Sequence, residues 1–213
     1  MARLRLTEIF HSLQGESASV GWRTVFVRLT GCPLRCVYCD TSYAFRGGDW
    51  WDIEAILDEV AAYDARHVTV TGGEPLAQPE CGALLKALCD LGYRVSLETS
   101  GAIDIGPVDP RVTKVMDLKT PGSGEADRNL YTNIECLSAN DQVKFVITGE
   151  EDYRWSRDQV ARWELPARCE VLFSPASGEL PPEELAGWIL RDRLDVRFQL
   201  QLHKVLWGNE PGR

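Results

Sequence analysis

The chain has 213 residues, 44% of them hydrophobic, which is enough to bury one sizeable core, and no long Pro-, Gly- or Ser-rich linker divides it. Its net charge of -9 at pH 7 argues against a nucleic-acid or anionic-membrane partner, because both attract clusters of Lys and Arg. No apolar run is long enough to span a membrane and no secretory signal is visible, so we expect one cytoplasmic domain covering residues 1–213.

The first half of the chain alternates strand-like and helix-like patterns. Residues 12–20 are polar and contain glycine, which indicates a loop, and Asp52 is a plausible N-cap for a helix that follows it. A second helix is predicted over residues 81–91, where apolar residues recur at helical spacing. Strands are predicted for residues 4–10, 24–29, 67–70 and 94–97.

The same alternation continues in the second half. Helices are predicted over residues 130–134 and 153–163, and a third opens with Pro181-Pro182-Glu183-Glu184, which has proline at its start and acidic residues in its first turn. The tail over residues 202–213 has an irregular pattern. Strands are predicted for residues 112–116, 142–147, 170–173 and 196–201.

Strands that alternate with helices indicate an α/β fold with a mainly parallel sheet. The polar motifs of this chain follow the predicted strands, which places them at the C-terminal rim where α/β barrels hold their active sites. A closed eight-unit barrel usually takes about 250 residues. We therefore expect a partial, open TIM-like β/α barrel.

Three cysteines within eight residues form the most specific motif, with the spacing C-x3-C-x2-C at Cys32, Cys36 and Cys39. A 4Fe-4S cluster held by three thiolates has one iron without a protein ligand, and that iron can bind a small chelating molecule. Structural zinc is the alternative, but it normally needs four ligands. Candidates for a remote fourth ligand are His11, Cys81 and His203.

The cysteine spacing, with the aromatic Tyr38 before the last cysteine, resembles the signature of the radical S-adenosylmethionine (SAM) superfamily. Within it, residues 8–17 and Asp40-Thr41 resemble the 7-carboxy-7-deazaguanine synthase family. Ser17 departs from that pattern, since glycine is common there. The resemblance continues through residues 71–75, 98–101, 117–119, 143–146, 174–175 and 203–204.

The resemblance implies that SAM binds the open iron of a 4Fe-4S cluster on the three cysteines. Gly72 and Gly73 would let the backbone approach the methionine moiety of SAM, and Glu74 would accept hydrogen bonds from its ammonium group. Without the family match, two adjacent glycines would more often be a turn. The other implied SAM contacts are Tyr38, Cys39, Asp40, Gly101, Asp141, Gln142, Val143, Ser174 and Pro175.

For the substrate, the resemblance implies 6-carboxy-5,6,7,8-tetrahydropterin. Its guanidine edge presents N–H donors that Glu16 could accept, and its carboxylate suits the bidentate cation of Arg28. Without the family, a solvated acid and a surface cation are the favoured interpretations of these two residues. The remaining expected substrate contacts are Leu13, Gln14, Gly15, Thr99 and Arg213.

Thr41 matches a position where the family binds Mg²⁺ through a hydroxyl, a hard oxygen ligand, and Asp40 is a possible helper. Thr41, Glu16 and Arg28 are thus the predicted catalytic residues. The implied reaction is a radical ring contraction that releases ammonia and regenerates SAM, the work of a carbon–nitrogen lyase in queuosine and 7-deazapurine precursor biosynthesis.

The family also implies a homodimer and an external one-electron reductant such as flavodoxin. Two other function classes stay open. A glycyl-radical enzyme activase would share the cluster and the fold but act on a protein. A non-enzymatic iron–sulfur electron carrier would need neither the glycine pair nor an open iron.

Overall fold

The computed structural model describes residues 2–208, 210 and 212. Its strands form one nine-stranded sheet in the order β3-β1-β2-β4-β5-β6-β7-β8-β9. Every pair from β2 to β9 is parallel, whereas β1 pairs antiparallel with both β2 and β3. The edge strands β3 and β9 do not pair with each other, so the barrel is open, as predicted.

The strands are β1 (Arg3–Leu13), β2 (Arg23–Leu29), β3 (Asp49–Asp52), β4 (His67–Gly72), β5 (Arg94–Thr99), β6 (Thr113–Asp117), β7 (Gln142–Ile147), β8 (Glu170–Pro175) and β9 (Arg197–Phe198). The α-helices are α1 (Ile53–Ala62), α2 (Cys81–Asp90), α3 (Glu150–Arg162), α4 (Pro182–Asp192) and α5 (Leu202–Trp207). Short 3-10 turns lie between β6 and β7, among them η3 (Pro121–Ser123), η4 (Ala126–Arg128) and η5 (Tyr131–Cys136). No helix in the described part of the chain is both long and apolar enough to cross a membrane.

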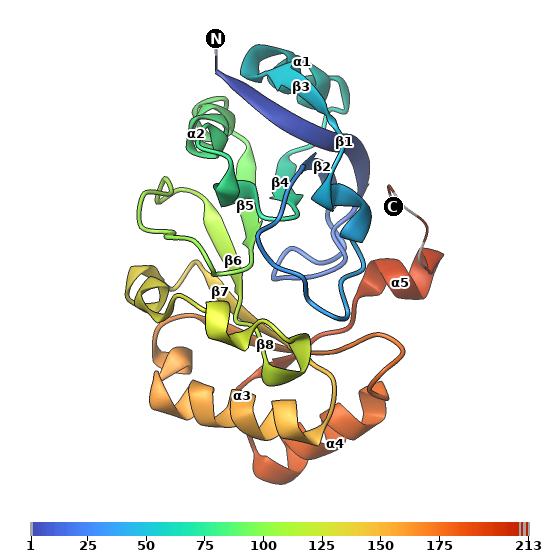
Figure 1. Ribbon diagram of the computed structural model, residues 1–213, viewed down its shortest axis with the longest axis vertical. Helices are drawn as coiled ribbons and strands as arrows, with labels where there is room; N and C mark the ends of the chain where they lie inside the picture. The colour runs from blue at the N-terminus through green and yellow to red at the C-terminus, as the bar shows by residue number, and fades with distance from the viewer. Residues whose placement is uncertain (1, 209, 211, 213) are drawn as a thin grey trace.

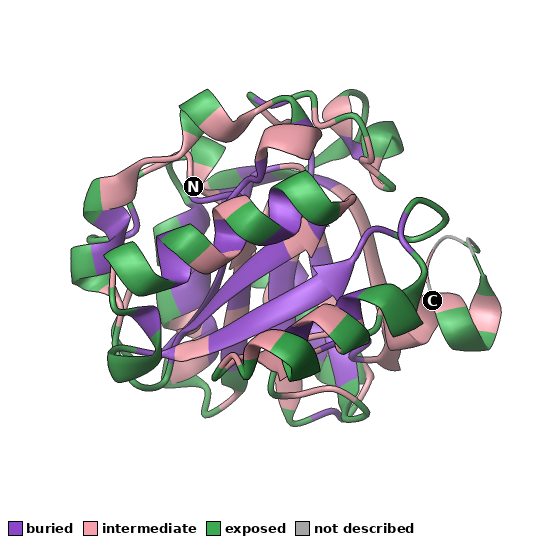
Figure 2. Cartoon of the chain, turned by 90° about the horizontal axis from the view of Figure 1, so that it is seen from below, coloured by how far each residue is buried: buried purple, intermediate pink, exposed green. Residues whose placement is uncertain are grey.

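The two faces of the sheet have opposite characters because side chains alternate along each strand. One face is apolar and packs against the outer helices α1 to α4; in β7, for example, it carries Val143, Phe145 and Ile147. Figure 1 shows those helices around the outside of the curved sheet, with α5 on the other side. Figure 2 shows the buried strands between helices whose outer faces are exposed. The second face is polar and lines the interior of the open barrel.

Several predicted boundaries were wrong, and each has a physical reason. Residues 12 and 13 extend β1 because they continue its pairing with β2, so the predicted loop begins later. The strand predicted over residues 196–201 shortens to β9, and part of the predicted irregular tail is the helix α5. The predicted helix over residues 130–134 is the 3-10 turn η5. Strand β3 was missed because it is a short edge strand that depends on pairing with β1.

Candidate active site

The cysteine loop follows β2 and is held against the end of β4. The amide of Gly73 donates to the carbonyl of Leu29 at 3.2 Å, and the amide of Glu74 donates to the carbonyl of Gly31 at 2.8 Å. A Cβ atom at Gly73 would overlap the Gly31 carbonyl and lie 2.7 Å from Cys32 Cβ. Glycine is therefore required where this strand end supports the loop.

A cavity of ≈ 830 Å³ opens at the polar face of the sheet, beyond the carboxyl ends of β2, β4 and β5. This volume lies in the range of small-ligand sites, about 300–1,000 Å³. Fourteen predicted site residues line it: Leu13, Gln14, Gly15, Glu16, Arg28, Cys32, Cys36, Tyr38, Cys39, Asp40, Thr41, Gly72, Gly73 and Thr99.

The other predicted site residues lie elsewhere. Val143 faces the apolar core, and Asp141 is buried in an ion pair with Lys114, whose Nζ is 3.1 Å from its carboxylate. Outside the cavity lining are Glu74, Gly101, Asp141, Gln142, Val143, Ser174 and Pro175. Arg213 lies outside the described residues.

Glu74 illustrates this separation, because its carboxylate is fully buried behind the cavity wall. It accepts hydrogen bonds from Thr99 Oγ1 at 3.0 Å, from the Ser100 amide at 2.6 Å and from Ser100 Oγ at 2.5 Å. It also caps the turn that follows, accepting from the Leu76 amide at 3.0 Å. Glu74 thus ties the end of β4 to the end of β5.

The three motif cysteines fit an iron–sulfur cluster. All three line the cavity as free thiols, and burial raises the pKa of each, so a cationic cluster would have to supply the charge that favours the thiolates. No three His, Cys, Asp or Glu side chains in the described part converge on a single metal ion. In the C-x3-C-x2-C motif each thiolate would bind a different iron of a cluster, whereas structural zinc normally needs four ligands on one ion. Two of the zinc candidates, His11 and Cys81, lie outside the cavity lining.

A buried cation organises the carboxylates at the floor of the cavity. Lys144 Nζ lies 2.6 Å from Glu16 Oε2 and 3.7 Å from Glu98 Oε2. Burial alone would raise the pKa of Glu16, but the charge of Lys144 and hydrogen bonds from Lys144 and Gln201 lower it below its usual value. Glu16 is therefore ionised, with both oxygens already engaged by donors.

Glu98 also faces Lys144, but its pKa is raised, whereas that of Glu16 is lowered. Burial raises the pKa of Glu98 to about 7; Lys144 opposes this rise, whereas the negative charge of Glu16 adds to it. Its Oε1 atom is buried without a hydrogen-bond partner among the described residues. A carboxyl that titrates near neutral pH and has an unused oxygen can donate or accept a hydrogen bond to a ligand.

The Arg28 side chain lines the cavity and packs against two aromatic rings. Its Nε donates to Glu8 Oε1 at 2.7 Å, and its guanidinium lies 5.5 Å from the ring centre of Phe10 and 5.8 Å from that of Tyr43. The two terminal nitrogens donate to no described residue, although the side chain is only 14% exposed. The fork is therefore oriented and available to an anion in the cavity.

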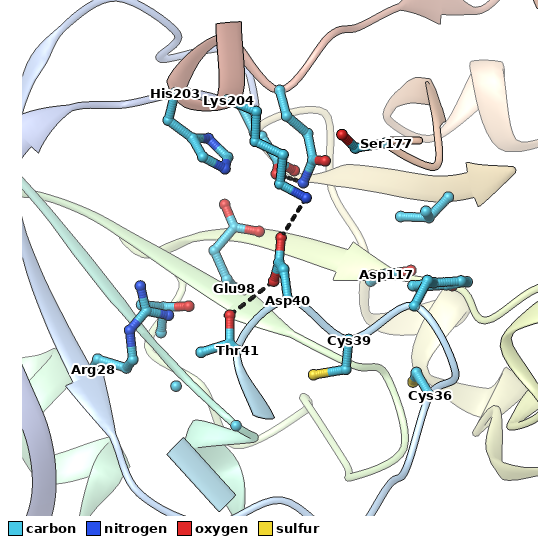
Figure 3. A pocket seen from close by; sticks show the side chains of 18 of the residues that line it. Arg28, Cys36, Cys39, Asp40, Thr41, Glu98, Asp117, Ser177, His203 and Lys204 are labelled. Atoms are coloured by element: carbon cyan, nitrogen blue, oxygen red, sulfur yellow. Dashed lines mark hydrogen bonds and ion pairs between the residues drawn. The ribbon is translucent and has the colours of Figure 1, made fainter. Parts of the chain in front are cut away.

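Helix α5 closes the opposite wall, as Figure 3 shows. Lys204 Nζ pairs with Asp40 Oδ2 at 2.8 Å, and Thr41 Oγ1 donates to Asp40 Oδ1 at 2.8 Å. Burial opposes ionisation of Asp40, but the charge of Lys204 and these hydrogen bonds lower its pKa to about 2. Thr41 and Asp40 thus offer hard oxygen atoms beside the cysteine loop.

Sequence reasoning missed several charged residues of this site. Glu98, Asp117 and Lys144 occupy inward positions of β5, β6 and β7, and Lys119 Nζ pairs with Asp117 Oδ2 at 2.7 Å. All three lie in segments that the resemblance included, but none was given a role. Asp117 and Lys144 also had a local signal, since each is a charged residue between two apolar neighbours in a predicted strand or at its end. Lys204 lies in a segment that the resemblance included, residues 203–204, but it was given no role because the tail was predicted as irregular.

Comparisons with known proteins agree with this geometry. Residues 26–118 match the model of the Radical SAM superfamily. The 7-carboxy-7-deazaguanine synthase of Chlorobaculum tepidum is 46% identical over 211 residues, covering 97% of this chain and 96% of the relative, and that of Koribacter versatilis is 39% identical over 222 residues, covering 97% and 98%. The crystal structure of QueE from Escherichia coli has the same fold, with a TM-score of 0.78 at 22% identity over 94% of this chain and 95% of that one.

Proposed function

Because the chain belongs to the 7-carboxy-7-deazaguanine synthase family of the Radical SAM superfamily, we propose that it converts 6-carboxy-5,6,7,8-tetrahydropterin to 7-carboxy-7-deazaguanine with loss of ammonia. The enzyme is then a carbon–nitrogen lyase of 7-deazapurine and queuosine precursor synthesis. A glycyl-radical enzyme activase is not favoured, since synthases match this chain over nearly its whole length.

One observation supports this proposal most directly: the three cysteines share a single cavity with Glu16 and Arg28. The cavity thus combines a cluster site, an ionised carboxylate for a guanidine edge and a cationic fork for a carboxylate. A pterin that carries both groups can be held at its two ends. An electron carrier would need no such pair.

The protein positions the pterin through groups that are ordered before it binds. Glu16 is held by Lys144 at 2.6 Å and by Gln201 Nε2 at 2.8 Å, so each of its oxygens has one lone pair left for a substrate N–H. Gln14 is anchored to Thr69 Oγ1 at 3.1 Å and accepts from the Glu16 amide at 3.2 Å. Thr99, at the end of β5, donates its hydroxyl proton to Glu74, so its oxygen can accept a hydrogen bond from the substrate.

A 4Fe-4S cluster on Cys32, Cys36 and Cys39 would supply the electron that cleaves SAM into a reactive adenosyl radical. Tyr38, Asp40, Gly72 and Gly73 line the cavity beside these cysteines. The two glycines let the end of β4 pack directly on the backbone of Leu29 and Gly31, which holds the cysteine loop beside this part of the cavity. Burial of the cavity floor excludes water from the reactive species. Contacts of SAM with Glu74, Gly101, Asp141, Gln142, Val143, Ser174 and Pro175 stay predictions, as does an Arg213 contact with the pterin.

Mg²⁺ would be held by Thr41, with Asp40 as its neighbour, and would supply electrostatic stabilisation to the rearranging pterin. Thr41 Oγ1 and the Asp40 carboxylate are oxygen donors of the kind that Mg²⁺ prefers. The ion would replace the hydrogen bond between Thr41 and Asp40 and the ion pair of Asp40 with Lys204. The remaining parts of the proposal are a single domain, a homodimer, a reductant such as flavodoxin and a cytoplasmic location.

Product formation tests the proposal. The protein is reconstituted anaerobically with iron and sulfide, then incubated with SAM, reductant, Mg²⁺ and the pterin, and products are followed by mass spectrometry. We expect 7-carboxy-7-deazaguanine without stoichiometric loss of SAM. Glu16→Gln should raise KM about 10- to 100-fold through loss of charge-assisted hydrogen bonds, whereas the exposed control Glu54→Gln should not. Cleavage of SAM without conversion of the pterin would refute the substrate assignment and would favour the glycyl-radical enzyme activase.

A further inference from the structure

A second pocket of ≈ 260 Å³ lies at the opposite end of the strands from the cysteine loop. Its lining is cationic and aromatic: Gly21, Trp22, Arg23, Arg66, His67 and Arg94. The sheet register brings these residues together, because Thr24 pairs with His67, and His67 pairs with Arg94, at the starts of three neighbouring parallel strands. Strand β2 runs from Arg23 to Leu29, so this pocket is roughly 20 Å from the cysteine loop at the rise of a strand.

The cationic side chains of this pocket have no acidic partner in the described part of the chain. Arg23, Arg66 and Arg94 form no ion pair with a carboxylate among the described residues, and no acidic side chain lines the pocket. Burial and the charges of Arg94 and Arg66 lower the pKa of His67, which places both cations close to its ring. Three like charges therefore converge in a chain whose net charge is -9.

An aromatic surface borders these cations. The Trp22 ring stacks on His67 with centroids 5.3 Å apart and an interplanar angle of 16°, and Trp22 is still 59% exposed. Two hydrogen bonds to backbone carbonyls hold the lining of the pocket in place. The Arg94 amide donates to the Arg66 carbonyl at 2.9 Å, and the Arg23 guanidinium donates to the Asp64 carbonyl at 3.4 Å. A fixed indole beside guanidinium groups suits a ligand that has both a planar ring and a phosphate.

We propose that this pocket, formed by Trp22, Arg23, Arg66, His67 and Arg94, is a binding site for a mononucleotide-sized organic phosphate, with the base on Trp22 and the phosphate on the arginines. Its volume lies just below the range of about 300–1,000 Å³ for small-ligand sites, which favours a small molecule over a polymer. Its distance from the cysteine loop separates it from the catalytic cavity and makes it unsuited to docking an electron donor.

Calorimetry tests the site directly. Reconstituted protein is saturated with SAM without reductant, so that the catalytic cavity is filled, and is then titrated with AMP or with inorganic phosphate. We expect AMP to bind more tightly than phosphate and more weakly at high salt. The double variant Arg66→Ala/Arg94→Ala should lose about tenfold or more in AMP affinity, and Arg94→Lys should lose less, because it keeps the charge without the fork.

The tryptophan half of the proposal has its own control. Trp22→Ala should weaken AMP binding and leave phosphate binding unchanged, whereas the equally exposed Trp50, replaced by alanine, should change neither. Arg168→Ala serves as the matched arginine control. Turnover of the pterin should be the same in all of these variants. The proposal is overturned if millimolar AMP fails to bind, if the double variant binds it normally, or if AMP and phosphate bind equally well.

Discussion

Replacing Lys144 with methionine would remove the cation that balances the cavity floor. The substitution keeps the length and most of the volume of the side chain but leaves Glu16 and Glu98 without their shared partner. Both members of the Lys144–Glu16 pair are largely buried, with side-chain exposures of 11% and 13%. Solvent therefore screens the pair poorly.

The magnitude follows from this burial. Breaking a buried ion pair by removing one partner typically costs ~3–5 kcal/mol. We take the lower end, about 3 kcal/mol, because both side chains line a cavity and do not lie in the sealed core. In a chain of this size that corresponds to a fall in Tm of roughly 6–12 °C. Without Lys144, burial dominates and raises the pKa of Glu16 above its unfolded value. An acid with a raised folded-state pKa loses stability as pH rises through that pKa, so the deficit should be larger at pH 8 than at pH 5.

Thermal unfolding of the apoprotein, followed by tryptophan fluorescence at both pH values, measures this effect. The control is Lys86→Met, which removes an exposed ion pair with Asp90 in α2 and should change stability by less than about 1 kcal/mol. A Lys144→Met protein as stable as the control, or one whose deficit does not grow with pH, would refute the reasoning. In the active enzyme the same change should raise KM for the pterin, because Glu16 is no longer held ionised.

Three further predictions concern the cavity. Glu98→Gln removes a carboxyl whose folded-state pKa of about 7 lies above its unfolded value of 4.5, so the wild type loses stability as pH rises through this range. Relative to the wild type, the free energy of unfolding of the variant should therefore rise by up to ~3 kcal/mol between pH 5 and pH 8. A pH profile of kcat/KM for the variant should lose its limb near pH 7. Cys39→Ser should abolish the visible absorption of the reconstituted cluster, whereas exposed Cys136→Ser should retain it; equal iron content in both would contradict the ligand assignment. Gly73→Ala should prevent cluster assembly, because the new methyl group would displace the cysteine loop. Its control is Gly82→Ala in α2, which has open space around it and should raise the free energy of unfolding, measured in urea, by about 0.5–1 kcal/mol.

The fold class could be predicted because its signals are local. Each parallel strand is a short β-branched or apolar run, and the helices between them have apolar residues at helical spacing, so the open, mainly parallel barrel is confirmed. The missed parts depend on contacts distant in sequence. Strand β3 forms by pairing with β1, and α5 is fixed by a hydrogen bond from the Leu202 amide to the Gly15 carbonyl at 2.9 Å. No window of residues around either element contains its partner.

The family resemblance is confirmed, and its motifs located the cavity, but they did not reveal the charge balance within it. Lys144 has the sequence context of an ordinary buried strand, and only the fold brings it to Glu16, 128 positions earlier. For Ser17 the sequence comparison noted something unusual that only the structure explains. The resemblance marked it as a departure from glycine, and the structure gives the reason, since its φ of 67° lies in the left-handed region that favours glycine. Its hydroxyl bonds to Ser19 at 2.9 Å, which supports this conformation.

Helix α5 couples the two halves of the cavity. Gln201, at its N-cap, donates to Glu16 on the substrate side, while Lys204 binds Asp40 in the cysteine loop. The helix can come this close because Gly15 has no side chain; a Cβ atom there would overlap the ring of His203. A shift of α5 would therefore disturb Glu16 and Asp40 together. One six-residue helix thus orients groups that we propose for the pterin and for Mg²⁺. If both proposals hold, alignment of the two sites depends on the docking of this helix as well as on the rigid sheet.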